Sequence, residues 1–128
     1  MTSRYAEHTV ASAADLPDGA HLVVEASGRE IGIFNVRGRL YALPNVCPHQ
    51  NGPLCRGVTS GTLRASAESQ WKSQWILDGE VVVCPWHGLE FEIPTGRCIA
   101  YPARSLPMFE AKIVGNKIVL VLPRDRSQ

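Results

Sequence analysis

Two short segments of this 128-residue chain each place one cysteine close to one histidine. The first is Cys-Pro-His at residues 47–49, and the second is Cys-Pro-Trp-His at residues 84–87. Thiolate sulfur and imidazole nitrogen are ligands for iron, copper and zinc, so the two segments together predict a metal site. The candidate ligands are Cys47, His49, Cys84 and His87.

The order of these ligand types favours two metal ions over one. Zinc fingers commonly supply a cysteine pair first and a histidine pair later, whereas each segment here supplies one of each type. In a [2Fe-2S] cluster every iron needs two protein ligands. Cys47 and Cys84 can take one iron while His49 and His87 take the other. A structural zinc site with the same four ligands is the alternative interpretation.

Residues around the two segments resemble the Rieske family. The similarity includes Asn51-Gly52-Pro53-Leu54, Gly88, Phe91, Thr95-Gly96 and Pro102-Ala103, and it runs roughly from the first predicted strand to the last. The resemblance implies one [2Fe-2S] cluster, with His49 and His87 on one iron at an exposed tip. It also implies that Cys47 and Cys84 lie deeper in the protein.

The charge of such a cluster indicates its reduction potential. Two ferric ions, two sulfides, two thiolates and two neutral imidazoles sum to zero, so Rieske potentials fall at about −150 to +300 mV. High-potential relatives place Ser and Tyr where this chain has Leu89 and Phe91, and a loop-linking cysteine where it has Trp86. The chain therefore resembles the low-potential, ferredoxin-like branch.

The elements that must position these ligands are predicted to be β-strands. Runs of β-branched, aromatic and aliphatic residues, separated by turn pairs, occur at 21–26, 30–36, 39–43, 80–84, 89–93, 97–101, 109–114 and 117–122. In the last run, Leu120 faces one side and Val119 and Val121 the other, which predicts burial on both faces. The expected fold class is all-β, a Rieske-like antiparallel β-sandwich or partly closed barrel with a small two-loop cluster-binding subdomain.

The connection between the two segments is longer than in compact Rieske ferredoxins. Its extra length falls at about residues 59–78, where Trp71 and Trp75 are four residues apart. That spacing favours a short helix or an ordered loop at 65–77. The tryptophans either pack this insertion onto the β-body or form a surface for a partner.

We expect a single Rieske [2Fe-2S] domain at residues 1–128, with cluster loops at about 45–57 and 84–91. Residues 1–5 and 124–128 are predicted to be tails. Cys55 and Cys98 match no ligand position, and they are predicted to be buried thiols, with a disulfide between them as the alternative. His8 and His21 are assigned no role.

Composition excludes several classes of function. The net charge of +1 gives no basic field for nucleic acid, and no run approaches the roughly 20 apolar residues that span a bilayer. Without an export signal, the protein is expected to be cytoplasmic. The sequence contains no phosphate loop, nucleophile elbow or dinucleotide fingerprint, so no substrate turnover of its own is expected.

The expected function is that of a ferredoxin component, which passes electrons from a flavin reductase to a terminal oxygenase. One alternative is the small [2Fe-2S] subunit of an oxidoreductase that resembles nitrite reductase. Another is an interaction module in which the metal centre is structural or redox-sensing. The expected partners are therefore a reductase with a terminal oxygenase, or a large catalytic subunit.

Overall fold

The structure is a computed structural model that describes residues 4–45, 58–64, 74–84, 88–101 and 105–123, together with residues 70, 72 and 103. These residues form β1 (Tyr5–Ser12), η1 (Ala13–Asp15), β2 (His21–Ala26), β3 (Arg29–Val36), β4 (Arg39–Pro44), β5 (Val58–Arg64), β6 (Gln74–Val83), β7 (Glu90–Glu92), β8 (Glu110–Val114) and β9 (Lys117–Pro123). The element η1 is a single turn of 3-10 helix. No α-helix is found in the described part of the chain, and the all-β prediction is confirmed.

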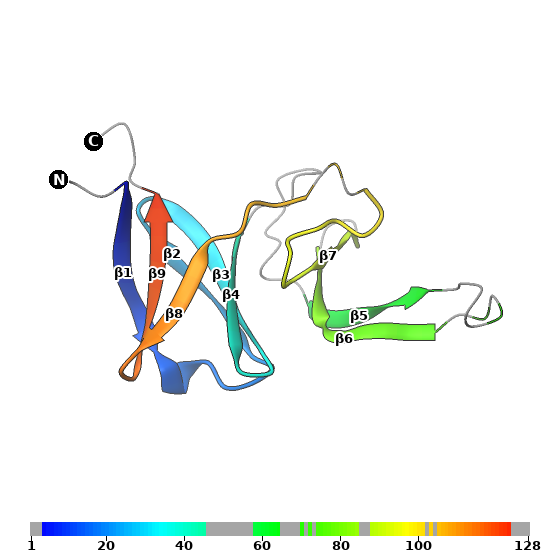
Figure 1. Cartoon of the computed structure of the whole chain (residues 1–128), viewed down its shortest axis with the longest axis horizontal. Helices are drawn as coiled ribbons and strands as arrows, with labels where there is room; N and C mark the ends of the chain where they lie inside the picture. Colours follow the sequence, from blue (N-terminus) through cyan, green and yellow to red (C-terminus); the bar gives the residue numbers. More distant parts are fainter. Residues whose placement is uncertain are drawn as a thin grey trace.

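The strands form three antiparallel sheets of three strands each, with the orders β1-β9-β8, β2-β3-β4 and β5-β6-β7. The first two sheets form one body, and the third lies at its side (Figure 1). The sheets are not closed into a barrel, so the expected sandwich is the better description. Tyr5 pairs with Pro123, which places the two ends of the described chain side by side.

The core of the body lies between its two sheets. Ile33 of β3 and Leu120 of β9 are fully buried in one apolar cluster. Burial of a side chain of this size contributes about 1.5–3 kcal/mol. On the other face of β9, Val119 is 6% exposed and Val121 is partly buried, so the predicted two-sided burial is confirmed for most of this strand.

A second apolar cluster attaches the third sheet to the body. Phe34 and Leu43, from the β3–β4 hairpin, pack with Val82 of β6 and Phe91 of β7 in this cluster. All four side chains are 1% exposed or less. The cluster therefore brings the end of β4 close to the end of β6, and these are the strands from which the two predicted cluster loops begin.

Two turn pairs that were predicted between strands of the body, Ser27-Gly28 and Arg37-Gly38, have a left-handed backbone conformation. Ser27 and Gly28 have φ of 55° and 74°, and Arg37 and Gly38 have φ of 53° and 88°. Positive φ at both central residues defines the type I′ turn, whose twist matches the strands that it joins. The β2–β3 and β3–β4 hairpins are therefore closed by their turn residues as predicted.

The predicted strand at 97–101 is wrong. Only Cys98 forms a β-bridge, to Phe91, and Ile99 and Ala100 after it are bends. Gly96 precedes this stretch with φ of 75°, and its carbonyl accepts a hydrogen bond from the Leu106 amide at 2.8 Å. The chain therefore turns toward residues 105–108, and a longer ladder with β7 does not form.

The expectation of a short helix or an ordered loop at 65–77 is wrong at residues 74–77, which form strand, whereas residue 70 is in a turn and residue 72 has no regular structure. Residues 59–64 belong to β5 and residues 74–78 belong to β6, and Thr62 pairs with Ile76. Threonine, isoleucine and tryptophan favour strands, and ladder pairing prevails over the helix-like tryptophan spacing. Trp71 lies outside the described residues.

The first strand was not predicted, and Tyr5 belongs to it instead of to a tail. Along β1 the exposed and partly buried side chains alternate, as expected for a strand with one covered face. In the part of the chain that the structure describes, no helix is long and apolar enough to cross a membrane.

Candidate metal centre

Cys84 follows the last residue of β6 and is 1% exposed. Its amide donates a hydrogen bond to the Leu89 carbonyl at 2.8 Å, and its carbonyl accepts one from the Gly88 amide at 2.9 Å. Gly88 has φ of 72°, a conformation that glycine adopts without strain. These bonds fix the position of the Cys84 backbone at the base of the predicted second cluster loop.

The surroundings of the Cys84 sulfur are apolar. Phe34, Leu43, Val82 and Phe91 belong to the same buried cluster, which contains no charged side chain among the described residues. An isolated thiolate would be unfavourable there, because charges are buried only when paired or bound to metal. A cluster with two thiolates and two imidazoles is neutral when oxidised, and such a group fits this environment.

The predicted first cluster loop begins after β4, at a neighbouring point of the fold. Asn45 follows β4 and is 5% exposed. Its backbone N–H donates a hydrogen bond to the Glu30 carbonyl at 2.9 Å. Cys47 comes two residues later in the sequence. The structure thus brings together the ends of β4 and β6, after which the two predicted ligand segments follow in the sequence. Of the predicted ligands it describes Cys84, whereas Cys47, His49 and His87 lie outside the described residues.

Leu89 and Phe91, which occupy the positions where high-potential relatives have Ser and Tyr, are apolar side chains in apolar surroundings. Phe91 is fully buried in the cluster that contains Cys84, and Leu89 packs against the same cluster. Hydrogen bonds to the ligand sulfurs raise the reduction potential of iron–sulfur clusters, and neither side chain can donate one. This packing favours the low-potential branch.

The other cysteine and histidine predictions concern Cys98, Cys55, His21 and His8. Cys98 is a fully buried free thiol, as predicted, while Cys55 lies outside the described residues. The His21 ring stacks on Phe34, with ring centroids 4.8 Å apart, so this histidine has a structural role. His8 lies on β1 opposite Leu120.

The Thr95-Gly96 pair of the motif closes the end of β7. The Thr95 hydroxyl donates a hydrogen bond to Glu92 at 3.2 Å and accepts one from the Arg97 amide at 3.2 Å. A Cβ atom at Gly96 would lie only 2.5 Å from the Leu106 carbonyl oxygen. The glycine therefore allows the 105–108 segment to approach the third sheet closely.

Arg37 links the body to the third sheet, and this contact was missed in the sequence. Its guanidinium donates a hydrogen bond to the Asp78 carbonyl at 2.8 Å and forms an ion pair with Glu80 at 3.1 Å. Both partners lie on β6, four to six residues before Cys84. Because the partners are about forty residues apart in sequence, no local pattern indicates this contact.

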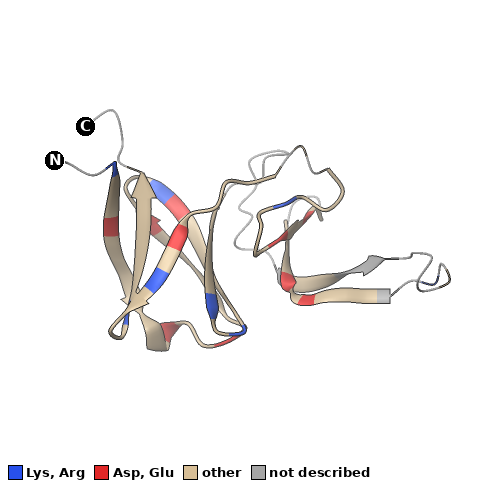
Figure 2. Cartoon of the chain, in the orientation of Figure 1, with Lys and Arg blue, Asp and Glu red and all other residues tan. Residues whose placement is uncertain are grey.

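Charged side chains are present along β6 and β7 of the third sheet (Figure 2). Glu80 is paired with Arg37, and Glu92 is paired with Arg97 at 3.2 Å. Glu80 and Glu92 therefore each have a basic partner within the described part of the chain.

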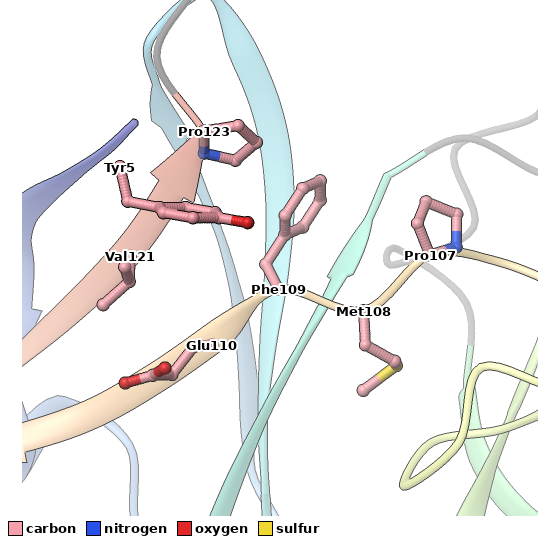
Figure 3. Close-up of a pocket in the computed structure, with 7 residues that line it drawn as sticks. All are labelled: Tyr5, Pro107, Met108, Phe109, Glu110, Val121 and Pro123. Atoms are coloured by element: carbon pink, nitrogen blue, oxygen red, sulfur yellow. The ribbon is translucent and has the colours of Figure 1, made fainter. Parts of the chain in front are cut away.

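A cavity of about 480 Å³ lies on the β1-β9-β8 sheet, away from the ligand segments in sequence. Tyr5, Phe109 and Glu110 are among its lining residues (Figure 3). The described residues that line it include no cysteine or histidine, so the cavity offers none of the ligand types of a Rieske cluster.

The chain matches the Rieske [2Fe-2S] domain family over residues 6–112. The ferredoxin component of the naphthalene 1,2-dioxygenase system of Pseudomonas aeruginosa is 28% identical over 109 residues, which are 84% of this chain and 88% of that protein. The ferredoxin of carbazole 1,9a-dioxygenase from Nocardioides aromaticivorans IC177 superposes with a TM-score of 0.67 at 25% identity, and the match covers 92% of this chain and 98% of that one. A putative nitrite reductase small subunit has a TM-score of 0.68, with 90% and 97% coverage, and at 17% identity it shows the fold alone.

The antiparallel sheets, the buried Cys84 and the paired Cys/His segments define an iron–sulfur protein of the electron-transfer class. The chain belongs to the Rieske [2Fe-2S] domain family. It therefore carries one [2Fe-2S] cluster, in agreement with the expectation from its sequence.

Proposed function

We propose that this protein is the ferredoxin component of an oxygenase system and carries single electrons from a flavin reductase to a terminal oxygenase. The family match over residues 6–112 is the observation that carries this proposal. Relatives named as ferredoxin components of dioxygenase systems support it. When bound, the cluster supplies a reversible one-electron couple.

In this proposal the chain's own residues hold and shield the cluster. Cys47 and Cys84 ligate one iron, while His49 and His87 ligate the other. The hydrogen bonds of the Cys84 backbone keep its sulfur in the apolar cluster, where water has little access. Residues 1–128 act as one Rieske domain in the cytoplasm, with cluster loops at about 45–57 and 84–91.

The first prediction concerns the spectra of protein purified without oxygen. Dithionite should reduce the protein by one electron, bleach part of its visible absorption, and produce an EPR signal whose average g lies below the free-electron value. Optical and low-temperature EPR spectra before and after reduction test this. A colourless protein with stoichiometric zinc would contradict the proposal and favour the structural zinc site.

The second prediction concerns the reduction potential. Because Leu89 and Phe91 provide no hydroxyl donor, we expect a potential in the lower part of the range of about −150 to +300 mV. A redox titration followed by EPR measures it. A potential near the top of that range would contradict assignment to the ferredoxin-like branch.

The alternative of a nitrite-reductase-like small subunit predicts a different behaviour during purification. A subunit should remain bound to a large catalytic chain, whereas a ferredoxin component should elute separately. Size-exclusion chromatography of the native protein distinguishes them. The likeness to nitrite reductase small subunits shows the fold alone, so the ferredoxin proposal comes first.

A further inference from the structure

Trp75 on β6 is an exposed tryptophan held in one position. Its side chain is 54% exposed, and its indole N–H donates a hydrogen bond to the Asp78 carboxylate at 2.9 Å. The ring packs against Gly61 of β5, where an added Cβ would lie 2.8 Å and 2.9 Å from two ring carbons. Only a glycine at that position leaves room for the ring. One part of the indole is therefore fixed on the strand while the rest faces solvent.

The segment that carries Asp78 is fixed as well. Ser60 pairs with Val81 and Thr62 with Ile76, so residues 77–80 of β6 bulge out opposite Gly61. Leu77 and Gly79 adopt positive φ, of 57° and 77°, on either side of Asp78. Arg37 then binds the Asp78 carbonyl from the β3–β4 turn, which faces the corner of β6 (Figure 1). The bulge is thus held from both sheets.

The Asp78 carboxylate is exposed, and its charge is unpaired among the described residues. Arg37 pairs with the carboxylate of Glu80 and contacts only the backbone carbonyl of Asp78. Among the residues that the structure describes, no basic side chain forms an ion pair with the Asp78 carboxylate, which accepts the indole hydrogen bond. An exposed indole face beside a carboxylate attracts a cation through both the ring quadrupole and the charge.

We propose that Trp75 and Asp78 form a docking site for a basic side chain, arginine or lysine, on the surface of a protein redox partner. The cation would lie over the indole face and next to the Asp78 carboxylate. Because Gly61 and Arg37 already hold the site in place, binding orders few side chains, which favours affinity. Tryptophan is also enriched among residues that dominate interface energies. This inference rests on the proposed electron-carrier function and specifies one contact of its partner.

Electron transfer to cytochrome c, a haem protein with a lysine-rich surface, provides the main test. Stopped-flow mixing of dithionite-reduced protein, freed of excess dithionite, with ferric cytochrome c follows one electron from cluster to haem. Trp75→Ala and Asp78→Asn should each lower the second-order rate at low ionic strength at least fivefold. Trp75→Phe, which keeps a smaller aromatic face, should give an intermediate rate.

Two variants on the far sheet serve as matched controls. Tyr5→Ala removes an aromatic ring that is 56% exposed, and Glu110→Gln neutralises an exposed carboxylate, both far from β6 (Figure 1). Both controls should keep the unmodified rate within a factor of about 1.5. Equal slowing in all variants, or no slowing in the Trp75 and Asp78 variants, would overturn the docking site.

A second measurement separates this site from the electron-carrier proposal, because it needs no electron transfer. The indole N–H resonance of Trp75 is followed by NMR while N-acetyl-arginine amide is added to the holoprotein. Neutral N-acetyl-citrulline amide, which is nearly isosteric, is added in a parallel titration. A saturable shift with arginine alone, lost in Asp78→Asn, supports the site. Equal shifts with both compounds, or none, would refute it even if the spectra establish a Rieske cluster.

Discussion

Cys84→Ala is expected to yield a protein that retains no [2Fe-2S] cluster. Cys84 is the proposed ligand that the structure describes, and, apart from Cys98, the buried members of its apolar cluster that the structure describes are aliphatic or phenylalanine side chains, which bind no iron. Alanine fits the space, but it leaves one iron with a single protein ligand. We expect cluster occupancy, measured by iron content and visible absorption, to fall to less than about a tenth of the unmodified value.

The matched control is Cys98→Ala. Cys98 is buried as deeply as Cys84, in the same apolar cluster, and both thiols are free. If burial of a thiol were all that mattered, the two variants would behave alike. Full cluster occupancy in Cys98→Ala with loss in Cys84→Ala would assign the ligand. The reverse pattern would contradict the ligand set.

The second large effect is expected for Gly96→Ala. An alanine there must adopt φ of 75°, which costs about 1–2 kcal/mol, and its Cβ would collide with the Leu106 carbonyl oxygen at 2.5 Å. Moving the 105–108 backbone aside adds a packing cost of about 1–3 kcal/mol. We therefore expect a loss of about 2–5 kcal/mol in the free energy of unfolding, measured as a lowered thermal and urea midpoint.

Gly38→Ala separates the two contributions. Gly38 has φ of 88°, and nothing lies within 4 Å of an added Cβ. Only the backbone cost of about 1–2 kcal/mol should appear in this variant. If both glycine variants lost the same stability, the close approach of Leu106 to Gly96 would not contribute, and the packing argument would fail.

The sequence correctly predicted strands in which the pattern of apolar residues and the neighbouring turn residues indicate the same bounds. Residues 21–26 form β2 with the predicted bounds, because Ser27 and Gly28 provide a turn with positive φ directly after an aliphatic run. Residues 117–122 were likewise predicted, because aliphatic side chains follow one another on both faces of β9. In both strands the signal is local, so the sequence was sufficient.

The failures share a different cause, which is contact between residues distant in sequence. The 97–101 stretch has the composition of a strand, but Gly96 and Leu106 bond to each other and turn the chain away. The four-residue spacing of Trp71 and Trp75 indicated a helix, and it did not indicate that β5 pairs with β6 across a bulge. The Arg37 contact with β6 is also long-range.

For the metal centre, the two Cys/His segments indicated the types of ligand. The structure shows the surroundings of one predicted ligand, Cys84. The resemblance implied that the cysteines lie deep, and Cys84 is buried accordingly. Sequence alone could not show that β4 and β6 end in one apolar cluster, because that requires Leu43 and Cys84 to meet across two sheets. The pairing of His49 with His87 remains a prediction.

The pairing of β1 with β9 has a consequence for how this domain can be used. Since Tyr5 and Pro123 lie opposite each other, the chain enters and leaves the fold at one place, away from the β5-β6-β7 sheet (Figure 1). A tag, a linker or a catalytic module joined at either end would lie away from the β5-β6-β7 sheet, from which the predicted second cluster loop begins. The same architecture can thus operate as a diffusing protein or as a unit within a longer polypeptide.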